Sequence, residues 1–244
     1  MSIEFVVALS AAIFVVAMMY SSVGHAGASG YIAVMTLFSL APASIRPTAL
    51  VLNILVASLA SWHFARAGHL SLRRVAPFAL TSVPAAFLGG YLTLPFAAFN
   101  ILLGLVLLYS AAYLFFVKPS EREPVAPPLA VALVCGAAIG LLSGLTGTGG
   151  GIFLSPLLLL MGWARTKETA AISAVFILLN SSAGLLGNLA STAHLPAFIW
   201  PLLACAAVGG FIGSRLGAGP ASTTVIRRLL AAVLVVAGGK LLLT

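Results

Sequence analysis

The sequence has very few charged residues for its length, and it contains no aspartate. Only 7% of its 244 residues are charged, whereas soluble domains carry roughly 25%. The mean hydropathy is +1.18, and 61% of the residues are apolar. So few charges cannot cover the surface of a soluble globule. The composition therefore argues against a soluble enzyme and against a nucleic-acid binder, and it indicates an all-α, polytopic integral membrane protein.

The interiors of the apolar runs contain no carboxylate, and the sequence contains no cluster of metal-ligand residues. Four acidic residues lie at the ends of runs or in loops: Glu4, Glu121, Glu123 and Glu168. Proton and sodium pumps normally need a carboxylate within the membrane, so cation export is disfavoured. Cys135 and Cys205 stand alone in apolar runs, without the spacing of a metal site. We therefore expect no metal and no cofactor.

Ten apolar runs divide the chain, and several approach the roughly 20 residues that a membrane-spanning helix needs. They lie near residues 3–23, 30–45, 48–66, 75–94, 97–117, 129–145, 150–163, 168–190, 196–214 and 223–243. The second and seventh runs are short, and we expect them to be partial or tilted crossings. The sequence thus predicts 8–10 transmembrane segments, arranged as a first membrane repeat (1–117), a cytoplasmic linker (118–128) and a second membrane repeat (129–244).

The basic residues predict the orientation in the membrane. When successive loops are assigned to alternate sides, ten of the twelve Lys and Arg residues fall on one side. The other side takes only Arg46 and Lys240. Because cytoplasmic loops are enriched in Lys and Arg, both termini are predicted to lie outside the cytoplasm. The orientation in the membrane therefore accounts for the net charge of +8, and we expect no nucleic-acid partner.

The two halves resemble each other at a shift of about 120 residues. Residues 24–32 (Gly-His-Ala-Gly-Ala-Ser-Gly-Tyr-Ile) align with residues 144–152 (Gly-Leu-Thr-Gly-Thr-Gly-Gly-Gly-Ile), and residues 88–90 align with 208–210. Each half contains an odd number of runs, so the halves are predicted to be inverted relative to each other. Secondary transporters commonly have inverted repeats and bind their substrates at the repeat interface.

A glycine cluster separates the first and second runs of each half. A helix broken there frees backbone N–H groups, which an anion at the next helix N-terminus would satisfy. Nearby hydroxyl and amide groups and His25 can add hydrogen bonds, although Ser and Thr often bond only their own helix. The predicted anion-binding residues are Ser22, Gly24, His25, Gly27, Ser29, Asn53, Thr146, Gly147, Thr148, Gly149, Gly150, Gly151, Asn180 and Ser181.

Other residues have different predicted roles. Two further glycine series have the spacing of close helix packing rather than of a site: Gly136, Gly140 and Gly144, and Gly209, Gly213 and Gly217. Four basic residues are expected at the entrances of an anion pathway: Arg46, Arg165, Lys167 and Arg215. Glu168 could reach inward from a helix start.

These features favour a secondary carrier of a small anion, embedded in a lipid bilayer. A channel-like anion pathway and a non-transporting scaffold or assembly factor remain alternatives. An intramembrane enzyme would need a nucleophile and a base, and His25 with a neighbouring serine is the only conceivable pair. No third group orients that pair, so we expect no enzymatic activity. The sequence leaves a homo-oligomer open.

The segment from Gly144 to Pro156, Gly-Leu-Thr-Gly-Thr-Gly-Gly-Gly-Ile-Phe-Leu-Ser-Pro, resembles the TauE/SafE family of membrane permeases, the sulfite exporter family. The twofold repeat and the chain length are similar as well. The resemblance implies a small protein of the bacterial inner membrane that moves sulfite, sulfonates or related organic anions. It marks Gly147, Gly149, Gly150, Gly151 and Pro156. The first half departs from the pattern at His25, Ala26, Ala28, Ser29 and Tyr31.

Overall fold

The computed structural model describes residues 3–92, 96–116, 123–191 and 198–219, together with residues 234, 235, 239 and 242. Over these residues the chain is all-helical, which confirms the predicted class. Its helices are α1 (Ile3–Ser21), α2 (Ala28–Leu37), α3 (Pro42–Arg66), α4 (Leu72–Tyr91), α5 (Phe96–Phe116), α6 (Leu129–Thr146), α7 (Gly151–Leu160), α8 (Thr166–Ser191) and α9 (Ile199–Ala218). Most of the predicted run at 223–243 and linker residues 118–122 lie outside the described residues.

Five described helices are long and apolar enough to cross a membrane: Ile3–Ser21, Ala43–Arg66, Leu129–Thr146, Thr166–Ala190 and Ile199–Ala218. The protein is therefore embedded in a membrane. By contrast, α2 and α7 have only 10 residues each. At 1.5 Å per residue such a helix is about 15 Å long, half the thickness of a hydrocarbon core. The second and seventh runs thus each contain a helix too short to span the hydrocarbon core, which agrees with the expected partial crossings; those crossings and the total of 8–10 stay predictions.

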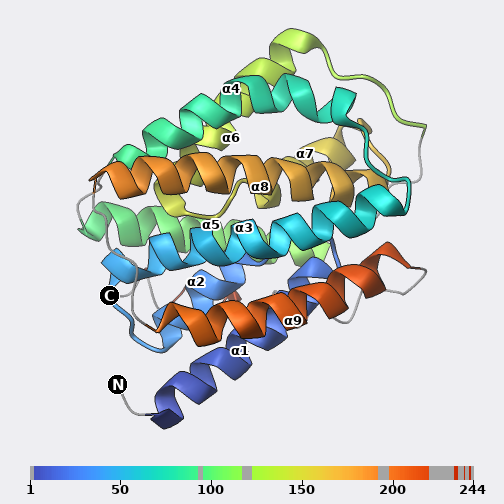
Figure 1. Ribbon diagram of the computed structural model, residues 1–244. Coiled ribbons are helices and arrows are strands. Elements are labelled where there is room, and N and C mark those ends of the chain that lie inside the picture. The colour runs from blue at the N-terminus through green and yellow to red at the C-terminus, as the bar shows by residue number, and fades with distance from the viewer. Residues whose placement is uncertain are drawn as a thin grey trace.

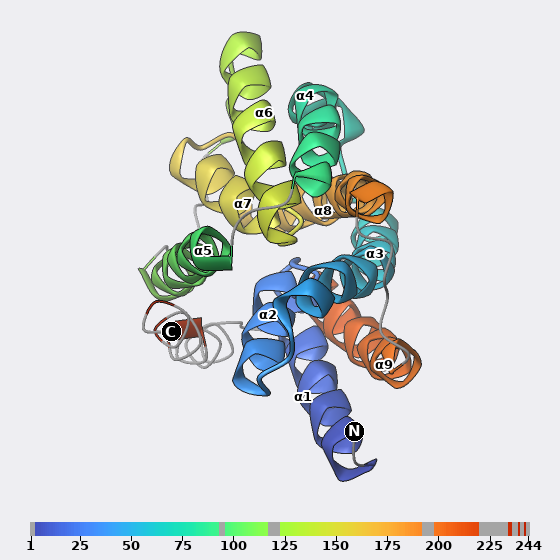
Figure 2. The ribbon, with the colours of Figure 1, turned by 90° about the vertical axis from the view of Figure 1, so that its left-hand side faces the viewer.

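Each half of the sequence packs one of its helices against helices of the other half (Figures 1 and 2). Helix α4 of the first half packs on α6 and α8, whereas α9 of the second half packs on α1 and α3. Helices α3 and α8 pack on each other between these two groups. Corresponding helices therefore have corresponding partners, as expected for two related repeats. The inversion of one repeat relative to the other stays a prediction.

Glycines hold the exchanged helices at very short separations. A Cβ atom on any residue of the two predicted packing series would lie closer than 3.0 Å to a backbone oxygen of the neighbouring helix or, for Gly217, of the residue directly after it. The pairs are Gly136 with Phe78, Gly140 with Ser82, Gly144 with Ala86, Gly209 with Phe14, Gly213 with Met18, and Gly217 with Ser22. Small residues permit such backbone contact between membrane helices. The packing role predicted for both series is confirmed.

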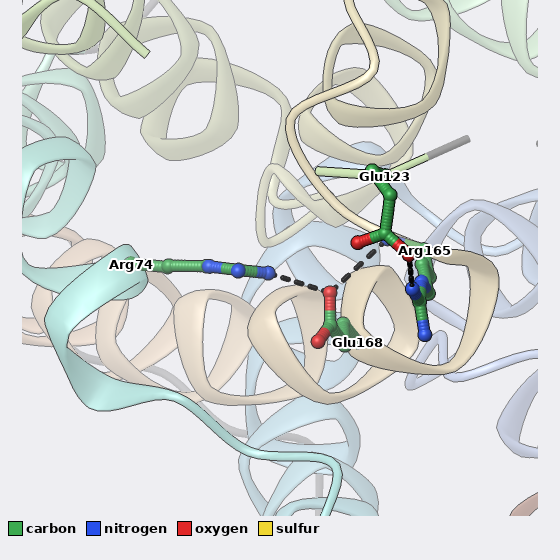
Figure 3. A network of polar contacts seen from close by, with 4 residues as sticks. All are labelled: Arg74, Glu123, Arg165 and Glu168. Carbon is green, nitrogen blue, oxygen red and sulfur yellow. Dashed lines mark hydrogen bonds and ion pairs between the residues drawn. The ribbon is translucent and has the colours of Figure 1, made fainter. Parts of the chain in front are cut away.

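Most described cations lie at one end of the bundle. Figure 3 shows a polar network there, in which Arg74 at the start of α4 contacts the Glu168 carboxylate at 2.5 Å. The same carboxylate accepts a hydrogen bond from the backbone N–H of Arg165, whose guanidinium pairs with Glu123. Glu168 therefore faces this end rather than the bundle interior. The other cations of this end are Arg66, Arg73, Lys167 and Arg215, so Arg46 is the one described Lys or Arg at the opposite end.

Candidate functional site

The chain breaks between α1 and α2 and again between α6 and α7, as the glycine clusters predict. Gly27 precedes α2 with a φ of 108°, and Gly150 precedes α7 with a φ of 79°. These left-handed backbone angles favour glycine, because other residues clash there. Each break thus turns the chain directly into a short helix.

Both short helices begin without a side-chain cap. The described residues place no side-chain hydrogen bond on the N-terminus of α2 or of α7, since both N-cap residues are glycines. The first N–H groups of a helix have no acceptor within it, and the helix dipole adds partial positive charge. Each break therefore presents hydrogen-bond donors suited to an anion.

Residues of both breaks line one small cavity. Residues 25–29 come from the first break, Thr148 and Ile152 come from the second, and Tyr20 and Ile177 complete the wall. The cavity volume is about 10 Å³. A cavity of this size holds roughly one water molecule. Two glycine clusters about 120 residues apart in the sequence are thus brought together around a single polar space.

A hydrogen-bonded chain of side chains connects the first break to the second half. The Nε2 atom of His25 lies 2.7 Å from the hydroxyl of Ser155 in α7. That hydroxyl lies 2.7 Å from the hydroxyl of Ser173 in α8. All three side chains are buried. His25 is therefore held in place by residues of the other half, at the edge of the cavity.

A second polar contact lies where α3 meets α8. The Asn53 side-chain nitrogen donates to the Ser181 hydroxyl at 3.2 Å and to the Thr148 carbonyl at 3.4 Å. A Cβ on Gly149 would lie 2.6 Å from the Asn53 nitrogen and 2.7 Å from the Ser181 oxygen. Only glycine leaves room for this approach. Asn53 and Ser181 thus fix the position of the second break.

Short-range bonds orient the hydroxyl groups at the cavity. The Ser29 hydroxyl donates to the Tyr20 oxygen at 3.1 Å. The Thr146 and Thr148 hydroxyl oxygens are 2.9 Å apart, and Thr146 also donates to the Leu142 carbonyl at 2.7 Å. Because the single hydroxyl hydrogen of Thr146 is committed to Leu142, Thr148 is the donor in the pair.

Of the predicted site residues, His25, Gly27, Ser29 and Thr148 line the cavity, and Asn53, Gly149 and Ser181 lie beside it. Gly151 contacts Ile177 of the cavity wall. The others have their closest partners elsewhere: Ser22 with Met19 and Gly217, Gly24 with Ala170, Thr146 with Leu142, Gly147 with Arg46, Gly150 with Phe176, and Asn180 with the Phe176 carbonyl.

Sequence reasoning did not single out Ser155, Tyr20 or Ile177. Ser155 has a usable signal, because it is a hydroxyl directly before Pro156 in an apolar helix of 10 residues. Tyr20 and Ile177 have none, since apolar and aromatic residues occur throughout the runs. Their position at the cavity depends on contacts between distant segments.

Arg46 corrects one expectation. We expected it at a pathway entrance, but its side chain is buried, with 7% exposure. Its guanidinium donates to the carbonyls of Gly89, Gly90 and Leu92 at the end of α4. The last carbonyls of a helix lack intrahelical donors and carry partial negative charge, so Arg46 caps α4. It lies against Gly147 and fixes the second break to the first half.

The described residues contain no group of three or more His, Cys, Asp or Glu side chains that could hold a metal ion. Of the described carboxylates, Glu123 and Glu168 pair with arginines at the cationic end, and Glu4 lies in the first turn of α1. The residues that line the cavity, as the described part of the chain gives them, therefore include no carboxylate.

Comparison with known proteins gives two matches. The family model described as "Sulfite exporter TauE/SafE" matches residues 9–241. The chain is also 43% identical over 244 residues to a protein named "Probable membrane transporter protein y4hK" from Sinorhizobium fredii (strain NBRC 101917 / NGR234). That alignment covers 97% of this chain and 98% of the relative. No solved structure matches the chain.

Proposed function

The chain belongs to the sulfite exporter TauE/SafE family and is thus a membrane transporter, and we propose that it carries sulfite, a sulfonate or a related small organic anion. The observation that carries this proposal is the cavity shared by the two glycine breaks, because it combines hydrogen-bond donors from both halves. The anion is held by hydrogen bonds and helix dipoles rather than by an ion pair. The protein performs no chemical reaction on it.

The donors available at the cavity support weak, reversible binding. They are the first N–H groups of α2, the hydroxyls of Ser29 and Thr148, and the ring of His25. A helix N-terminus contributes about 0.3–1 kcal/mol to anion binding, and each hydrogen bond to a charged group about 1.5–3 kcal/mol. Part of this binding free energy is offset, because the hydroxyls must give up the hydrogen bonds that they already make. Such a site releases its anion readily, as a carrier must.

Transport requires the cavity to widen. At about 10 Å³ the cavity accommodates a water molecule but not an anion with a central sulfur atom and several oxygens. We propose that this conformation is closed to both sides, and that α2 and α7 separate when the anion enters. The His25–Ser155 contact and the Asn53–Ser181 hydrogen bond join the two halves beside the cavity, so they would lengthen in this motion.

We propose an orientation with the cationic end in the cytoplasm. Six described Lys and Arg residues lie at that end, in agreement with the enrichment of Lys and Arg in cytoplasmic loops. The proposal includes location in a bacterial inner membrane, both termini outside the cytoplasm, and two membrane repeats on either side of residues 118–128.

The test is counterflow of labelled sulfite into liposomes that contain the purified protein. Saturable uptake that accelerates with sulfite preloaded inside supports a carrier, whereas uptake without such acceleration supports a channel. Ser29→Ala is expected to raise the half-saturating concentration, because Ser29 lines the cavity. Ser22→Ala is the matched control, since Ser22 donates to the Met19 carbonyl and packs against α9. Equal effects of both changes, or no anion counterflow, would contradict the proposal.

A further inference from the structure

A second hollow lies at the cationic end, far from the glycine breaks in the sequence. It has a volume of about 410 Å³ and is lined by Trp62, His63, Arg66, Ala67, Phe211 and Arg215. These residues belong to the last turns of α3 and α9 and to the residue that follows α3. Figures 1 and 2 show the two helices side by side. We call this hollow the α3–α9 groove.

The α3–α9 groove carries uncompensated positive charge. Arg66 and Arg215 both line it, and both are exposed. Within the described part of the chain, the ion pairs of Glu123 and Glu168 are made with Arg165 and Arg74. Neither groove arginine therefore has an ion-pair partner among the described residues. Two guanidinium groups in one groove match the charge and geometry of a phosphate, which accepts paired hydrogen bonds from arginine.

Each wall of the groove also carries an exposed aromatic residue, Trp62 from α3 and Phe211 from α9. Trp62 is 49% exposed, and the Arg66 guanidinium lies 5.1 Å from the centre of its ring. Phe211 is 41% exposed and lies edge-on to His63, whose Nδ1 is 2.8 Å from the Ser214 hydroxyl. Exposed Trp beside Arg at the end of a spanning helix is typical of the membrane–water interface. The groove thus offers cations to a headgroup and aromatic surface to acyl chains.

We propose that the α3–α9 groove binds the phosphate of an anionic phospholipid from the surrounding leaflet. A soluble phosphate would use the two arginines but leave the exposed faces of Trp62 and Phe211 without a partner. Basic pockets between membrane helices are known as sites for acidic lipid headgroups. The proposal does not depend on the transported substrate. The competing explanation is that the two arginines only complement the C-terminal dipoles of their own helices.

The test measures lipid binding by the purified full-length protein in detergent. Native mass spectrometry records the bound fraction while phosphatidylglycerol, phosphatidylcholine or inorganic phosphate is added. Phosphatidylglycerol is expected to bind most tightly. Arg66→Gln and Arg215→Gln should each weaken it about fivefold, and the double variant about 30-fold. Arg73→Gln is the control, because it removes an exposed cation from the same end of the bundle without lining the groove.

Three outcomes would overturn the proposal. Equal weakening by Arg73→Gln would mean that net charge alone attracts the lipid. Equal binding of phosphatidylcholine would remove the requirement for an acidic headgroup. Displacement of phosphatidylglycerol by an equimolar amount of inorganic phosphate would make the groove a site for a free anion. Arg66→Lys with Arg215→Lys guards against misfolding, because it keeps the charge and should retain more binding than the double glutamine variant.

Discussion

The hydroxyl of Thr148 gives the sharpest test of the proposed anion site. In the closed cavity this hydroxyl donates to Thr146, whose own hydrogen is committed to the Leu142 carbonyl. An incoming anion must therefore draw the Thr148 hydrogen away from Thr146. The new bond to a charged acceptor is worth about 1.5–3 kcal/mol, and the bond given up is worth about 0.5–1.5 kcal/mol. The net contribution of Thr148 to binding is thus about 1 kcal/mol, or about a fivefold change in affinity.

These energies predict opposite changes in the half-saturating sulfite concentration for two variants whose side chains keep nearly the same shape. Thr148→Val removes the donor, so the half-saturating sulfite concentration in counterflow should rise about fivefold. Thr146→Val removes the internal acceptor of Thr148, so the anion no longer competes with it. The half-saturating concentration should then fall about two- to fivefold.

The assay measures initial rates of sulfite counterflow over a range of concentrations, with folded protein quantified by gel filtration. A rise in half-saturation for both variants would show that they act through general disruption of the break. An unchanged value for Thr148→Val would mean that this hydroxyl does not contact the anion, and the reasoning would fail.

Three further predictions concern the site, the packing and the topology. Ser181→Ala should lower the rate of counterflow more than Ser182→Ala, since Ser181 accepts a bond from Asn53 whereas the Ser182 hydroxyl donates to the Leu178 carbonyl of its own helix. Gly140→Ala should lower the thermal stability in detergent by about 1–3 kcal/mol, because its Cβ would overlap α4, whereas Gly184→Ala, with neighbours at 3.5 Å or more, should not. A C-terminal alkaline phosphatase fusion should be active, and a C-terminal fluorescent protein that folds only in the cytoplasm should stay dark.

Features that depend on local sequence could be predicted. The apolar runs indicate the helices, because a long apolar segment has few stable alternatives in a bilayer. The positions of both breaks follow from Gly27 and Gly150, whose backbone angles other residues avoid. The packing of Gly140 and Gly213 follows from their spacing to neighbouring glycines. In each case the physical cause lies within a few residues of the effect.

The partners of individual polar groups could not be predicted. Ser155 contacts His25 although 130 residues separate them in the sequence. The two residues do not occupy equivalent positions in the two repeats, so the repeat gives no hint of their contact. Arginine usually lies on the protein surface, yet Arg46 is buried because carbonyl groups at the end of α4 accept its hydrogen bonds. Such pairings depend on how α1 to α9 are arranged in space, which a single sequence does not encode locally.

The exchanged packing bears on how the cavity would open. Helices α4, α6, α7 and α8 form one group in Figure 2, and α1, α2, α3 and α9 form the other, so each group contains helices from both sequence halves. The tight glycine contacts of Gly140 with α4 and of Gly213 with α1 lie within a group, where sliding would force backbone atoms together.

The contacts between the two groups are mixed. Three of them are polar: His25 with Ser155, Asn53 with Ser181, and Arg46 with the end of α4. Others are apolar and close, since a buried apolar cluster joins α3 to α8 and a Cβ on Gly24 would lie 2.2 Å from Ala170.

Hydrogen bonds of neutral side chains between membrane helices contribute only about 0.6 kcal/mol on average, so the bonds of His25 and Asn53 can be exchanged for bonds to an anion or to water. We therefore expect the two groups to move as bodies about the apolar part of the α3–α8 contact, at Ala60, Phe64 and Ala174, so that Asn53 and Ser181 farther along the same helices can separate. The moving units are then these mixed groups, and the sequence repeats themselves do not move as units.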